Sequence, residues 1–478
     1  MKRSSRVTLL DAMADDKLFA PWFRDPASWV AWRAFLSALF ALPMRPDALA
    51  IYRACTGRTD PPTTVATEAW LVCGRRAGKS FILALIVVFL ACFHDYRKYL
   101  APGERGTVMV IATDRKQARV ILRYIRALLT RVPMVARMIE RETAEAFDLN
   151  NGVTIEVGTA SFKSVRGYTI LAALCDELAF WATDNSASPD YEVLNALRPA
   201  MSTIPNAMLL CASSPYARRG ALWNAHRQHY AKEGDPILVW QAETRAMNPR
   251  VPQTVIEEAM ERDPASAAAE FGAQFRSDIE SFVAREAVQA CVQPEIFERA
   301  PIGGQSYFAF CDPSGGSADA MTIAVAHAED DVTILDALRE AKPPFSPESV
   351  VKDFSDLLNS YRVSKVTGDR YAGEWPRERF REHGIEYEPA AKPKSDLYRD
   401  MLPALNSGKV ALLDHAKLIT QLVSLERRTA RGGRDSIDHP PGAHDDLANV
   451  AAGVVAASGV DRDLAAYASL DWVDGPDV

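Results

Sequence analysis

The sequence lacks the cysteine spacing of a zinc ribbon or of a disulfide-stapled secreted domain. Its seven cysteines lie far apart along the chain, and no two of them form a Cys-x-x-Cys pair. This usage favours a reducing compartment. A long apolar run is also lacking, because the longest spans the 13 residues 81–93, whereas a helix that crosses a bilayer needs ~20. We therefore expect a buried helix there and no membrane segment.

Neither a strong net charge nor an internal repeat is present. The net charge is −7 over 478 residues, which argues against a protein whose whole surface binds nucleic acid but leaves room for a local basic face. The apolar stretch at residues 7–10 ends at Asp11, so no signal peptide is expected. With 48% hydrophobic and 24% charged residues, the composition is that of a globular protein of two or three domains.

Strand-like and helix-like patterns alternate in the first half of the chain. This alternation predicts an α/β fold with a mostly parallel sheet. A helical segment, with apolar residues at i, i+3, i+4 spacing in residues 25–42, comes before it. Strands are predicted at residues 69–73, 107–112, 152–157, 171–175 and 207–212, and helices at residues 79–93 and 115–129.

The second half opens with helices, predicted at residues 255–262 and 265–275, that resemble a connector. Short strands are then predicted at residues 307–311, 321–327, 332–336 and 365–368, followed by a last helix at about residues 445–457. The expected parts are a helical segment 1–60, an α/β domain 61–250, a helical connector 251–299, a mixed-sheet domain 300–457 and an acidic, flexible tail 458–478.

Residues 73–80 have the sequence Cys-Gly-Arg-Arg-Ala-Gly-Lys-Ser and lie between an apolar strand and an apolar helix. That context is typical of a phosphate-binding loop, in which backbone N–H groups face the anion. Lys79 would reach the β- and γ-phosphates of ATP, and the Ser80 hydroxyl would bind Mg²⁺. Cys73 stands where the usual pattern has its first glycine, and the alternative is a helix N-terminus with a chance Lys-Ser pair. The loop proper comprises Gly74, Arg75, Arg76, Ala77 and Gly78.

Two later strand ends would complete a nucleotide site. One strand ends at Asp176 and Glu177; Asp176 would hold the Mg²⁺ shell, and Glu177 would orient and deprotonate the attacking water. Another strand ends in Ser213, Ser214 and Pro215, at a position where motor ATPases detect the γ-phosphate. The alternatives are a solvated acidic turn for the first and a capping turn for the second.

A local excess of positive charge lies in residues 71–141, which hold 14 Lys/Arg and 4 Asp/Glu. In the predicted helix, arginines at positions 115, 119, 123 and 126 share one face. Such a stripe is suited to tracking a phosphate backbone, and the alternative is an ordinary solvated face.

Carboxylates in the second half follow predicted strands or open a helix. Asp312 and Asp369 each end a strand, and Asp445 and Asp446 begin the last helix. Because they lie at these ends, the carboxylates can converge on one point. Two divalent metal ions ~4 Å apart would neutralise their charge and would activate water for phosphodiester hydrolysis. Their order and setting match the RNase H plan. Taken singly, Asp445 is equally a helix N-cap, and Asp312 is equally a turn residue before proline.

In this order the motifs resemble those of the large terminase subunit of tailed bacteriophages, over nearly the whole chain. The resemblance rests on the Arg-rich phosphate loop, Cys-Asp-Glu at 175–177, Ser-Ser-Pro at 213–215 and His-Asp-Asp-Leu-Ala at 444–448. By this likeness Asp312, Asp369 and either Asp445 or Asp446 are metal ligands of the nuclease. Arg166 is a candidate charge-stabilising arginine, in competition with Arg75 and Arg76.

The resemblance also implies an activity and a set of partners. A P-loop ATPase domain would use ATP and Mg²⁺ to translocate double-stranded DNA, and an RNase H-like nuclease domain would cut concatemeric DNA with Mg²⁺ or Mn²⁺. The implied partners are the portal protein of the procapsid, a small terminase subunit and further copies in a ring, a pentamer on the portal, with no membrane. The implied place is the cytoplasm of the infected host and not the finished virion. Alternatives are a helicase-like or repair ATPase with an appended nuclease, and a nucleotide-gated DNA-binding scaffold whose carboxylates are structural caps.

Overall fold

The computed structural model describes residues 7–160, 167–181, 189–317, 319–369, 375–429 and 435–459. The chain divides into two compact units. Unit 1 comprises residues 1–182 and 188–277, and unit 2 comprises residues 183–187 and 278–478. The division falls inside the segment 251–299 that was expected to be a connector. The tail beyond residue 459 lies outside the described residues.

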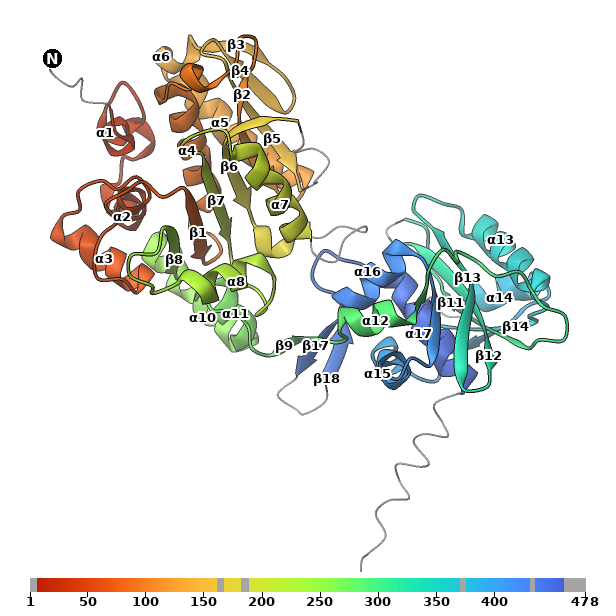
Figure 1. The fold of residues 1–478 in the computed structure, drawn as a ribbon. Helices are drawn as coiled ribbons and strands as arrows, with labels where there is room; N and C mark the ends of the chain where they lie inside the picture. The colour runs from red at the N-terminus through yellow and green to blue at the C-terminus, as the bar shows by residue number, and fades with distance from the viewer. Residues whose placement is uncertain are drawn as a thin grey trace, which may run out of the picture. The chain divides into compact units, whose positions relative to one another are not determined.

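Unit 1 is built on an eight-stranded sheet with the order β3-β4-β5-β2-β6-β7-β1-β8 (Figure 1). From β5 to β8 all neighbours are parallel, and at one edge β4 alone is reversed, since it is antiparallel to both β3 and β5. The predicted α/β class with a mostly parallel sheet is therefore confirmed. The strands are β1 (Glu68–Cys73), β2 (Gly106–Ala112), β3 (Ile139–Glu142), β4 (Ala146–Leu149), β5 (Val153–Thr159), β6 (Thr169–Asp176), β7 (Met208–Ser213) and β8 (Ile237–Ala242).

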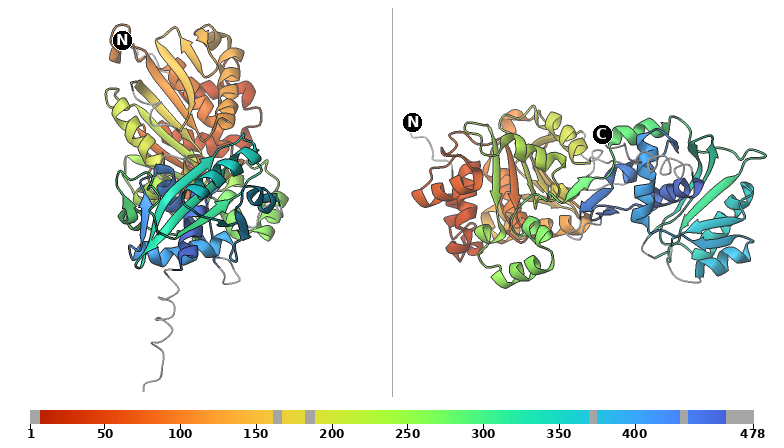
Figure 2. Two further views of the ribbon diagram at one scale, coloured as in Figure 1. Left: turned by 90° about the vertical axis from the view of Figure 1, so that its right-hand side faces the viewer. Right: turned by 90° about the horizontal axis from the view of Figure 1, so that it is seen from below.

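Helices cover both faces of this sheet (Figures 1 and 2). α4 (Lys79–Phe93) and α5 (Arg115–Arg131) pack on one face, and α7 (Pro189–Met201) and α8 (Gly220–His229) pack on the other. Parallel crossovers are right-handed, so connections that run toward opposite edges of a sheet leave it on opposite faces. The carboxyl ends of the central strands thus meet at a switch point, where open α/β sheets bind ligands.

α4 contains the longest apolar run of the sequence, and eleven of its residues are buried. The run is explained by packing inside unit 1, as the sequence predicted. No helix in the described part of the chain combines the length and the hydrophobicity of a membrane span.

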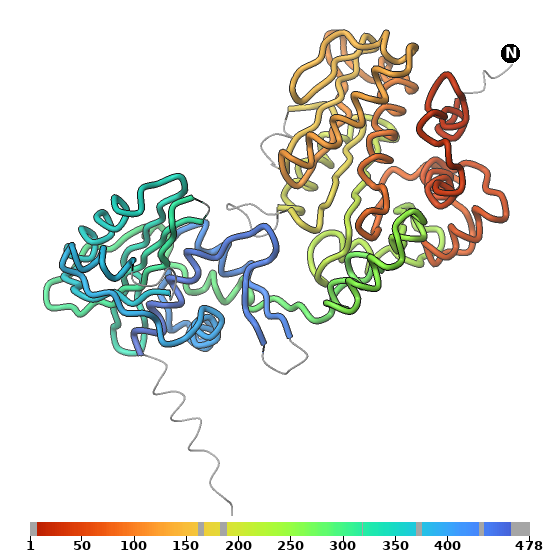
Figure 3. Tube along the Cα trace, turned by 180° about the vertical axis from the view of Figure 1, so that it is seen from behind, coloured from red at the N-terminus to blue at the C-terminus, as the bar shows by residue number. Residues whose placement is uncertain are grey.

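Residues 7–60 contain helices that belong to the core of unit 1 (Figure 3). Trp32 and Phe35 are fully buried, and Trp32 Nε1 donates a hydrogen bond to the carbonyl of Ala77 at 2.9 Å. The helices therefore support the segment that was predicted to bind phosphate. They are α1 (Leu9–Ala14), η1 (Ala20–Trp22), η2 (Pro26–Trp29), α2 (Val30–Leu39) and α3 (Pro46–Thr56).

Three short helices, α9 (Thr244–Met247), α10 (Gln253–Arg262) and α11 (Pro264–Glu270), complete unit 1. The predicted helix 265–275 is wrong in its second half. α11 ends at Glu270, and Ala273 adopts a φ of +55°, a left-handed conformation that a right-handed helix does not contain.

Unit 2 holds a seven-stranded mixed sheet with the order β10-β16-β13-β12-β11-β14-β15. β12 is antiparallel to both of its neighbours, whereas β11, β14 and β15 are parallel. The central order, third-second-first-fourth-fifth in the chain with the second strand reversed, is that of the RNase H fold and confirms the expected class. The strands are β10 (Val292–Gln293), β11 (Tyr307–Asp312), β12 (Met321–Glu329), β13 (Val332–Ala341), β14 (Lys365–Gly368), β15 (Glu386–Pro389) and β16 (Val410–Leu413).

Two separate hydrophobic clusters lie on the two faces of this sheet. One contains α12 (Arg285–Cys291), α15 (Lys394–Asn406), α16 (Ala416–Ser424) and α17 (Asp446–Ser458); the other contains α13 (Pro347–Ser360) and α14 (Trp375–Glu382). α17 approaches β11 closely, since a Cβ at Gly453 would meet the ring of Phe310 at 2.1 Å. A small antiparallel sheet is formed by β9 (Ile279–Ser281), β17 (Glu426–Thr429) and β18 (Asp435–Asp438).

Candidate nucleotide and metal sites

The candidate nucleotide-site residues of unit 1 meet at one edge of its sheet. β1, β6 and β7 are parallel, so the residues that follow their carboxyl ends lie near one another. β1 leads into the phosphate loop, β6 ends at Asp176 and β7 ends at Ser213. The first turn of α5 follows β2 at the same edge. Residues that are distant in the sequence can therefore form one site.

The phosphate loop has a backbone that requires its two glycines. Gly78 adopts a φ of +103° directly before α4, where an L side chain would be strained. Gly74 lies so close to its neighbours that a Cβ would meet Thr244 Oγ1 at 2.3 Å and the carbonyl oxygen of Phe271 at 2.6 Å. Cys73 is the buried last residue of β1, so the fold needs no glycine at that position.

Side chains from other segments hold the loop in place. Thr244 Oγ1 donates to the carbonyl of Arg75 at 2.8 Å, and Asn248 Nδ2 donates to the carbonyl of Arg76 at 2.8 Å. Trp32 Nε1 donates to the next carbonyl, that of Ala77. With these carbonyls engaged, the N–H groups at the start of α4 are left to face an anion.

Lys79 is buried among oxygen atoms from three elements. Its Nζ donates to the carbonyl of Cys73 at 3.0 Å and to Ser214 Oγ at 2.9 Å, and it lies 3.2 Å from Glu177 Oε1. Glu177 Oε2 in turn accepts from the N–H of Ser214 at 3.0 Å and from Ser213 Oγ at 3.2 Å. The strand ends that the sequence placed in one site are therefore in direct contact.

Ser80 and Asp176 form a second contact in this site. Ser80 Oγ donates to Asp176 Oδ2 at 3.0 Å, and Gln117 Nε2 donates to the same two atoms at 3.2 Å and 3.0 Å. Burial and the neighbouring carboxylate of Glu177 raise the pKa of Asp176. Asp176 Oδ1 is buried and has no hydrogen-bond partner among the described residues. An orphaned carboxylate oxygen beside a serine hydroxyl fits a hard divalent cation such as Mg²⁺.

Three further candidates of unit 1 belong to the phosphate loop or follow β7: Arg75, Arg76 and Pro215. Arg75 is exposed and pairs with Glu270 of α11, with 3.0 Å between Nη1 and Oε1, whereas Arg76 is exposed with a φ of +65°. Pro215 is buried directly after the Ser213–Ser214 pair. Arg166 lies outside the described residues, so its role stays a prediction.

In unit 2, Asp312 and Asp369 end neighbouring strands. β11 and β14 are parallel with Cys311 opposite Gly368, so the two aspartates that follow lie side by side. The N–H of Asp369 donates to the carbonyl of Cys311 at 3.2 Å. A Cβ at Gly368 would meet the Tyr387 hydroxyl at 2.3 Å, and that hydroxyl donates to the carbonyl of Asp369 at 2.8 Å. Close packing therefore fixes the backbone of Asp369.

Asp445 and Asp446 lie at the beginning of α17. Asp445 occupies the N-cap position, but its side chain makes no capping hydrogen bond. Gln421 caps the helix instead, because its Oε1 accepts from the N–H groups of Leu447 at 2.8 Å and Ala448 at 3.1 Å. The interpretation of Asp445 as a structural cap is therefore wrong.

Asp312 lies in the field of the other three aspartates. Burial, followed by the charges of Asp369, Asp446 and Asp445, raises its pKa to about 7, against one hydrogen bond from Asn449 Nδ2 at 2.8 Å. Burial and the charge of Asp445 also raise the pKa of Asp446. Oxygen ligands that repel one another in this way form a donor set that fits Mg²⁺ or Mn²⁺.

A lysine stands at one side of this cluster. Lys394 Nζ lies 2.8 Å from Asp438 Oδ1 and 3.1 Å from Asp445 Oδ2, and the Tyr398 hydroxyl donates to Asp445 Oδ2 at 2.8 Å. Asp438, His439 and Asp445 offer ligand atoms within 4.8 Å of one another, close enough for one metal ion. In this arrangement the ammonium group of Lys394 supplies the positive charge.

Several contacting residues were not identified from the sequence. Two of them had a visible signal: Asn449 is a polar residue within the apolar run of α17, and Gln117 lies in the first turn of a helix that follows a strand. No local pattern marks the others, which reach the sites through tertiary packing. They are Thr244, Asn248, Lys394, Tyr398, Asp438 and His439.

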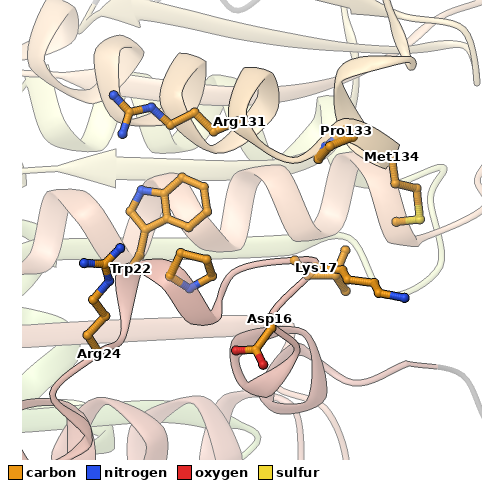
Figure 4. A pocket seen from close by; sticks show the side chains of 9 residues that line it. Asp16, Lys17, Trp22, Arg24, Arg131, Pro133 and Met134 are labelled. Atoms are coloured by element: carbon orange, nitrogen blue, oxygen red, sulfur yellow. The ribbon is translucent and has the colours of Figure 1, made fainter.

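A pocket of about 720 Å³ opens elsewhere in unit 1 (Figure 4). In this view Arg131, at the end of α5, lies above the ring of Trp22, and Arg24 lies below it. The pocket shares no lining residue with either of the two sites. It is lined by Asp16, Lys17, Leu18, Pro21, Trp22, Arg24, Arg131, Pro133 and Met134.

No protein-family model and no curated protein matches the sequence. Among solved structures, the chain is similar to the large terminase of bacteriophage HK97, with 16% identity and a TM-score of 0.38 over 87% of this chain and 96% of that chain. It is similar to the large terminase of a thermophilic bacteriophage in complex with ADP, with 14% identity and a TM-score of 0.36 over 84% of this chain and 94% of that chain. It is also similar to the large terminase nuclease of thermophilic phage G20c with bound magnesium, with 16% identity and a TM-score of 0.33 over 37% of this chain and 96% of that chain. These structural neighbours are large terminases, at a likeness too low to transfer the role of any residue.

Proposed function

We propose that the chain is the large subunit of a viral DNA-packaging terminase, with an ATP-hydrolysing motor in unit 1 and a metal-dependent DNA endonuclease in unit 2. One combination carries the proposal. The same chain gathers a lysine, a serine and two acids around a phosphate loop, and gathers four aspartates at a separate sheet. In this proposal the motor domain spans residues 61–250 after the helical segment 1–60, and the nuclease domain spans residues 300–457 between the connector 251–299 and the tail 458–478.

In the motor, Lys79 and the N–H groups at the start of α4 would bind the β- and γ-phosphates of ATP. Magnesium, held by Ser80 and through its shell by Asp176, would neutralise phosphate charge. Glu177 is suited to accept the proton of the attacking water, because its carboxylate is held by Ser213 and Ser214 at the end of β7.

The same contacts suggest how loss of phosphate is detected. Lys79 contacts Ser214 and Glu177 in this structure, and a γ-phosphate would draw its ammonium group away from both. The end of β7 would therefore change partners with each hydrolysis event, which is the local change that a bistable motor amplifies.

In the nuclease, Asp312, Asp369 and Asp446, with Asp445 beside them, would be the metal ligands. Bound Mg²⁺ or Mn²⁺ would activate water and stabilise the leaving oxygen in phosphodiester hydrolysis. The ligands come from two strand ends and one helix start, which are rigid supports. Asn449 orients Asp312, and Lys394 holds Asp445.

Double-stranded DNA would be the substrate of both units. The further partners would be the portal protein of the procapsid and a small terminase subunit that selects the cutting site. The motor would work as a ring of copies, a pentamer on the portal, in the cytoplasm of the infected host. Within such a ring Arg166 is the candidate arginine that would stabilise charge during ATP hydrolysis.

The geometry favours neither alternative. A helicase-like ATPase would need a second motor lobe, and in the described part of unit 2 the strand ends carry aspartates in place of a phosphate loop. A scaffold whose carboxylates are caps conflicts with Asp445, which does not cap α17.

The proposal requires two activities that can be lost separately. The full chain is assayed for ATP hydrolysis and for nicking of supercoiled plasmid with Mn²⁺. Lys79→Ala should abolish ATP turnover and leave nicking at the wild-type level, and Asp369→Ala should do the reverse. Lys232→Ala and Asp353→Ala, at exposed positions, are the matched controls and should change neither activity.

Several outcomes would overturn parts of this assignment. Loss of both activities in one variant, with an unchanged circular dichroism spectrum, would contradict two separable sites. Nicking by Asp369→Ala at the wild-type rate would remove the nuclease from the proposal. ATP-dependent unwinding of a forked duplex would favour a helicase, whereas ATP-dependent protection of DNA inside added procapsids supports packaging.

A further inference from the structure

Helix α5 carries two features that the proposed mechanism leaves unused. Its first turn touches the nucleotide site through Gln117, and its outer face carries a row of arginines. The helix has 17 residues, so it extends for roughly 25 Å from that site.

Gln117 is held at its backbone and at its side chain. Asp114, the N-cap of α5, accepts from the N–H groups of Lys116 at 2.7 Å and Gln117 at 2.9 Å, which fixes the first turn. The Gln117 carboxamide donates to Ser80 Oγ at 3.2 Å and to Asp176 Oδ2 at 3.0 Å. Both acceptors belong to the proposed magnesium site. A rearrangement of Ser80 and Asp176 must therefore change the hydrogen bonds that anchor α5.

The outer face of α5 presents arginines whose charge is not neutralised. Arg115, Arg119 and Arg123 are exposed and follow one another at intervals of four residues, about 6 Å along the axis. Within the described ranges, none of these three side chains forms an ion pair or a hydrogen bond. Arg126, the fourth member of the predicted stripe, differs because its Nε lies 2.6 Å from Glu142 Oε1. The row therefore has three members.

The opposite face of α5 is packed into the core of unit 1. Close-packed interfaces change between discrete arrangements and do not deform continuously, so a packed helix moves as one body. A change at the first turn would therefore also move the arginine row. The buried residues of this face are Ile121, Leu122, Ile125, Leu128 and Leu129.

We propose that Arg115, Arg119 and Arg123 bind the phosphate backbone of duplex DNA, and that Gln117 is the positioning residue that couples this binding to the nucleotide site. The inference rests on the proposed function of that site as an ATP site. A row of guanidinium groups at regular spacing suits a continuous phosphate backbone. Coupling of this kind is reciprocal, so Mg²⁺-nucleotide and DNA change each other's affinity by the same factor.

Duplex DNA is the expected ligand because α5 carries one aromatic side chain, Tyr124, whereas a single strand needs a series of rings for successive bases to stack on. Single-strand binders combine basic grooves with exposed aromatic side chains. Tyr124 is 39% exposed, and the edge-to-face contact of its ring with Phe81, at 5.5 Å between the ring centroids, fixes its position.

The DNA half of the inference is tested by fluorescence anisotropy of a labelled duplex, with the full chain carrying Asp369→Ala so that the probe is not cut. Replacing both Arg119 and Arg123 by Ala should weaken duplex binding at least ~10-fold and reduce the slope of log K against log salt by about 2. Arg262→Ala, an exposed arginine on α10, is the control and should change neither quantity. An unaltered salt slope in the double variant, or tighter binding of single strands than of duplex, would overturn the assignment.

The coupling half is tested by repeating the titration with Mg²⁺ and the slowly hydrolysed analogue ATPγS. Gln117→Ala should bind duplex like its parent without nucleotide and should lose the affinity shift that the analogue causes in the parent. Gln253→Ala, on α10, should keep that shift. A shift retained in full by Gln117→Ala would overturn the role of Gln117.

Binding of a fluorescent ATP analogue separates failure of the inference from failure of the proposed function. If the parent binds nucleotide and DNA without any mutual shift, the coupling is wrong and the ATP site stands. If the parent does not bind nucleotide in the presence of Mg²⁺, the proposed function of unit 1 fails together with the inference.

Discussion

The two acidic sites of this molecule balance their charge in opposite ways. In unit 1, Glu177 lies 3.2 Å from the buried ammonium group of Lys79, and Asp176 accepts hydrogen bonds from Ser80 and Gln117. In unit 2, Asp312 accepts one hydrogen bond from a neutral amide and lies in the field of three further aspartates. One site thus supplies its own cation, and the other accumulates negative charge.

This difference indicates which kind of ligand each site is suited to bind. A buried lysine and free N–H groups at a helix start suit the oxygen atoms of a polyphosphate. A cluster of aspartates, with Lys394 beside Asp445 at one side, suits divalent cations at its centre. The site of unit 1 therefore suits an anion, and the site of unit 2 suits cations. Changing one acid should impair ATP hydrolysis in unit 1 and metal-dependent nicking in unit 2.

The largest expected loss of activity follows from a change at Glu177, the acid of unit 1 that lies beside Lys79. Gln at position 177 keeps the size of the side chain but cannot take a proton from water, so Glu177→Gln should lower kcat for ATP by about 10³-fold. ATP should still bind, because Lys79 and the phosphate loop are unchanged. Steady-state hydrolysis and equilibrium binding of a fluorescent ATP analogue measure the two quantities.

Glu145→Gln is the matched control, since Glu145 is exposed and should leave both quantities at wild-type values. An unchanged kcat in Glu177→Gln would remove Glu177 from catalysis. Loss of nucleotide binding as well would mean that Glu177 acts by holding Lys79 and Ser214.

An effect of similar size is expected at the centre of the cluster in unit 2. Asp312→Asn removes a proposed metal ligand and should lower plasmid nicking with Mn²⁺ by about 10³-fold. Asn449→Ala removes only the amide that orients Asp312, and partners of a ligand typically contribute 10–100-fold. ATP hydrolysis should be unchanged in both variants, which makes it the internal control. Equal losses of nicking in the two variants would contradict this division of roles.

The sequence was sufficient where one element supplies the chemistry. The phosphate loop is predictable because Lys79 and Ser80 follow a strand and open a helix within a few residues. The acids at Asp312 and Asp369 are predictable because each directly follows an apolar strand, and parallel strands bring such ends together. In both cases the signal lies in a short stretch of sequence, and the parallel pairing of the strands brings the residues together.

The sequence was insufficient where packing between elements decides the contact. Gln421 caps α17 from a different helix, so the local pattern wrongly allowed Asp445 to be a cap. Lys394 reaches Asp445 from α15, and Thr244 holds the phosphate loop from α9. Nothing near these residues in the sequence shows which neighbour they will meet.

A smaller effect distinguishes the two adjacent aspartates of unit 2. Asp445 Oδ2 already accepts from Tyr398 and lies 3.1 Å from Lys394 Nζ, so Asp445 is partly neutralised without metal. Asp446→Asn should therefore weaken Mn²⁺ binding by about 10–100-fold, and Asp445→Asn by less than about 10-fold. Isothermal titration of Mn²⁺ into the full chain compares the two. The reverse order would show that the lysine-bound aspartate is the principal ligand.

The smallest expected effect is a pH dependence of stability that belongs to unit 2. Asp312 has its pKa raised from 3.8 to about 7 in the folded chain, so between these values the folded state holds a proton that the unfolded state has lost. The stability from this group is fully present below about pH 4 and is lost as the pH rises toward 7. From pH 5.5 to pH 7 the free energy of unfolding should fall by about 2 kcal/mol, or roughly 4–8 °C in Tm.

Calorimetry of the full chain in EDTA measures this slope, and the transition that Mn²⁺ shifts upward is the one to follow. Asp312→Asn should flatten the slope, because the amide does not ionise, and should make the metal-free chain more stable than wild type at pH 7.5. Asp176 also has a raised pKa and should give the transition of unit 1 a slope of the same sign, which Asp312→Asn leaves in place. Identical slopes for wild type and Asp312→Asn in the Mn²⁺-sensitive transition would mean that the aspartates of unit 2 do not accumulate charge in the metal-free state. The two sites would then not differ in how they balance their charge.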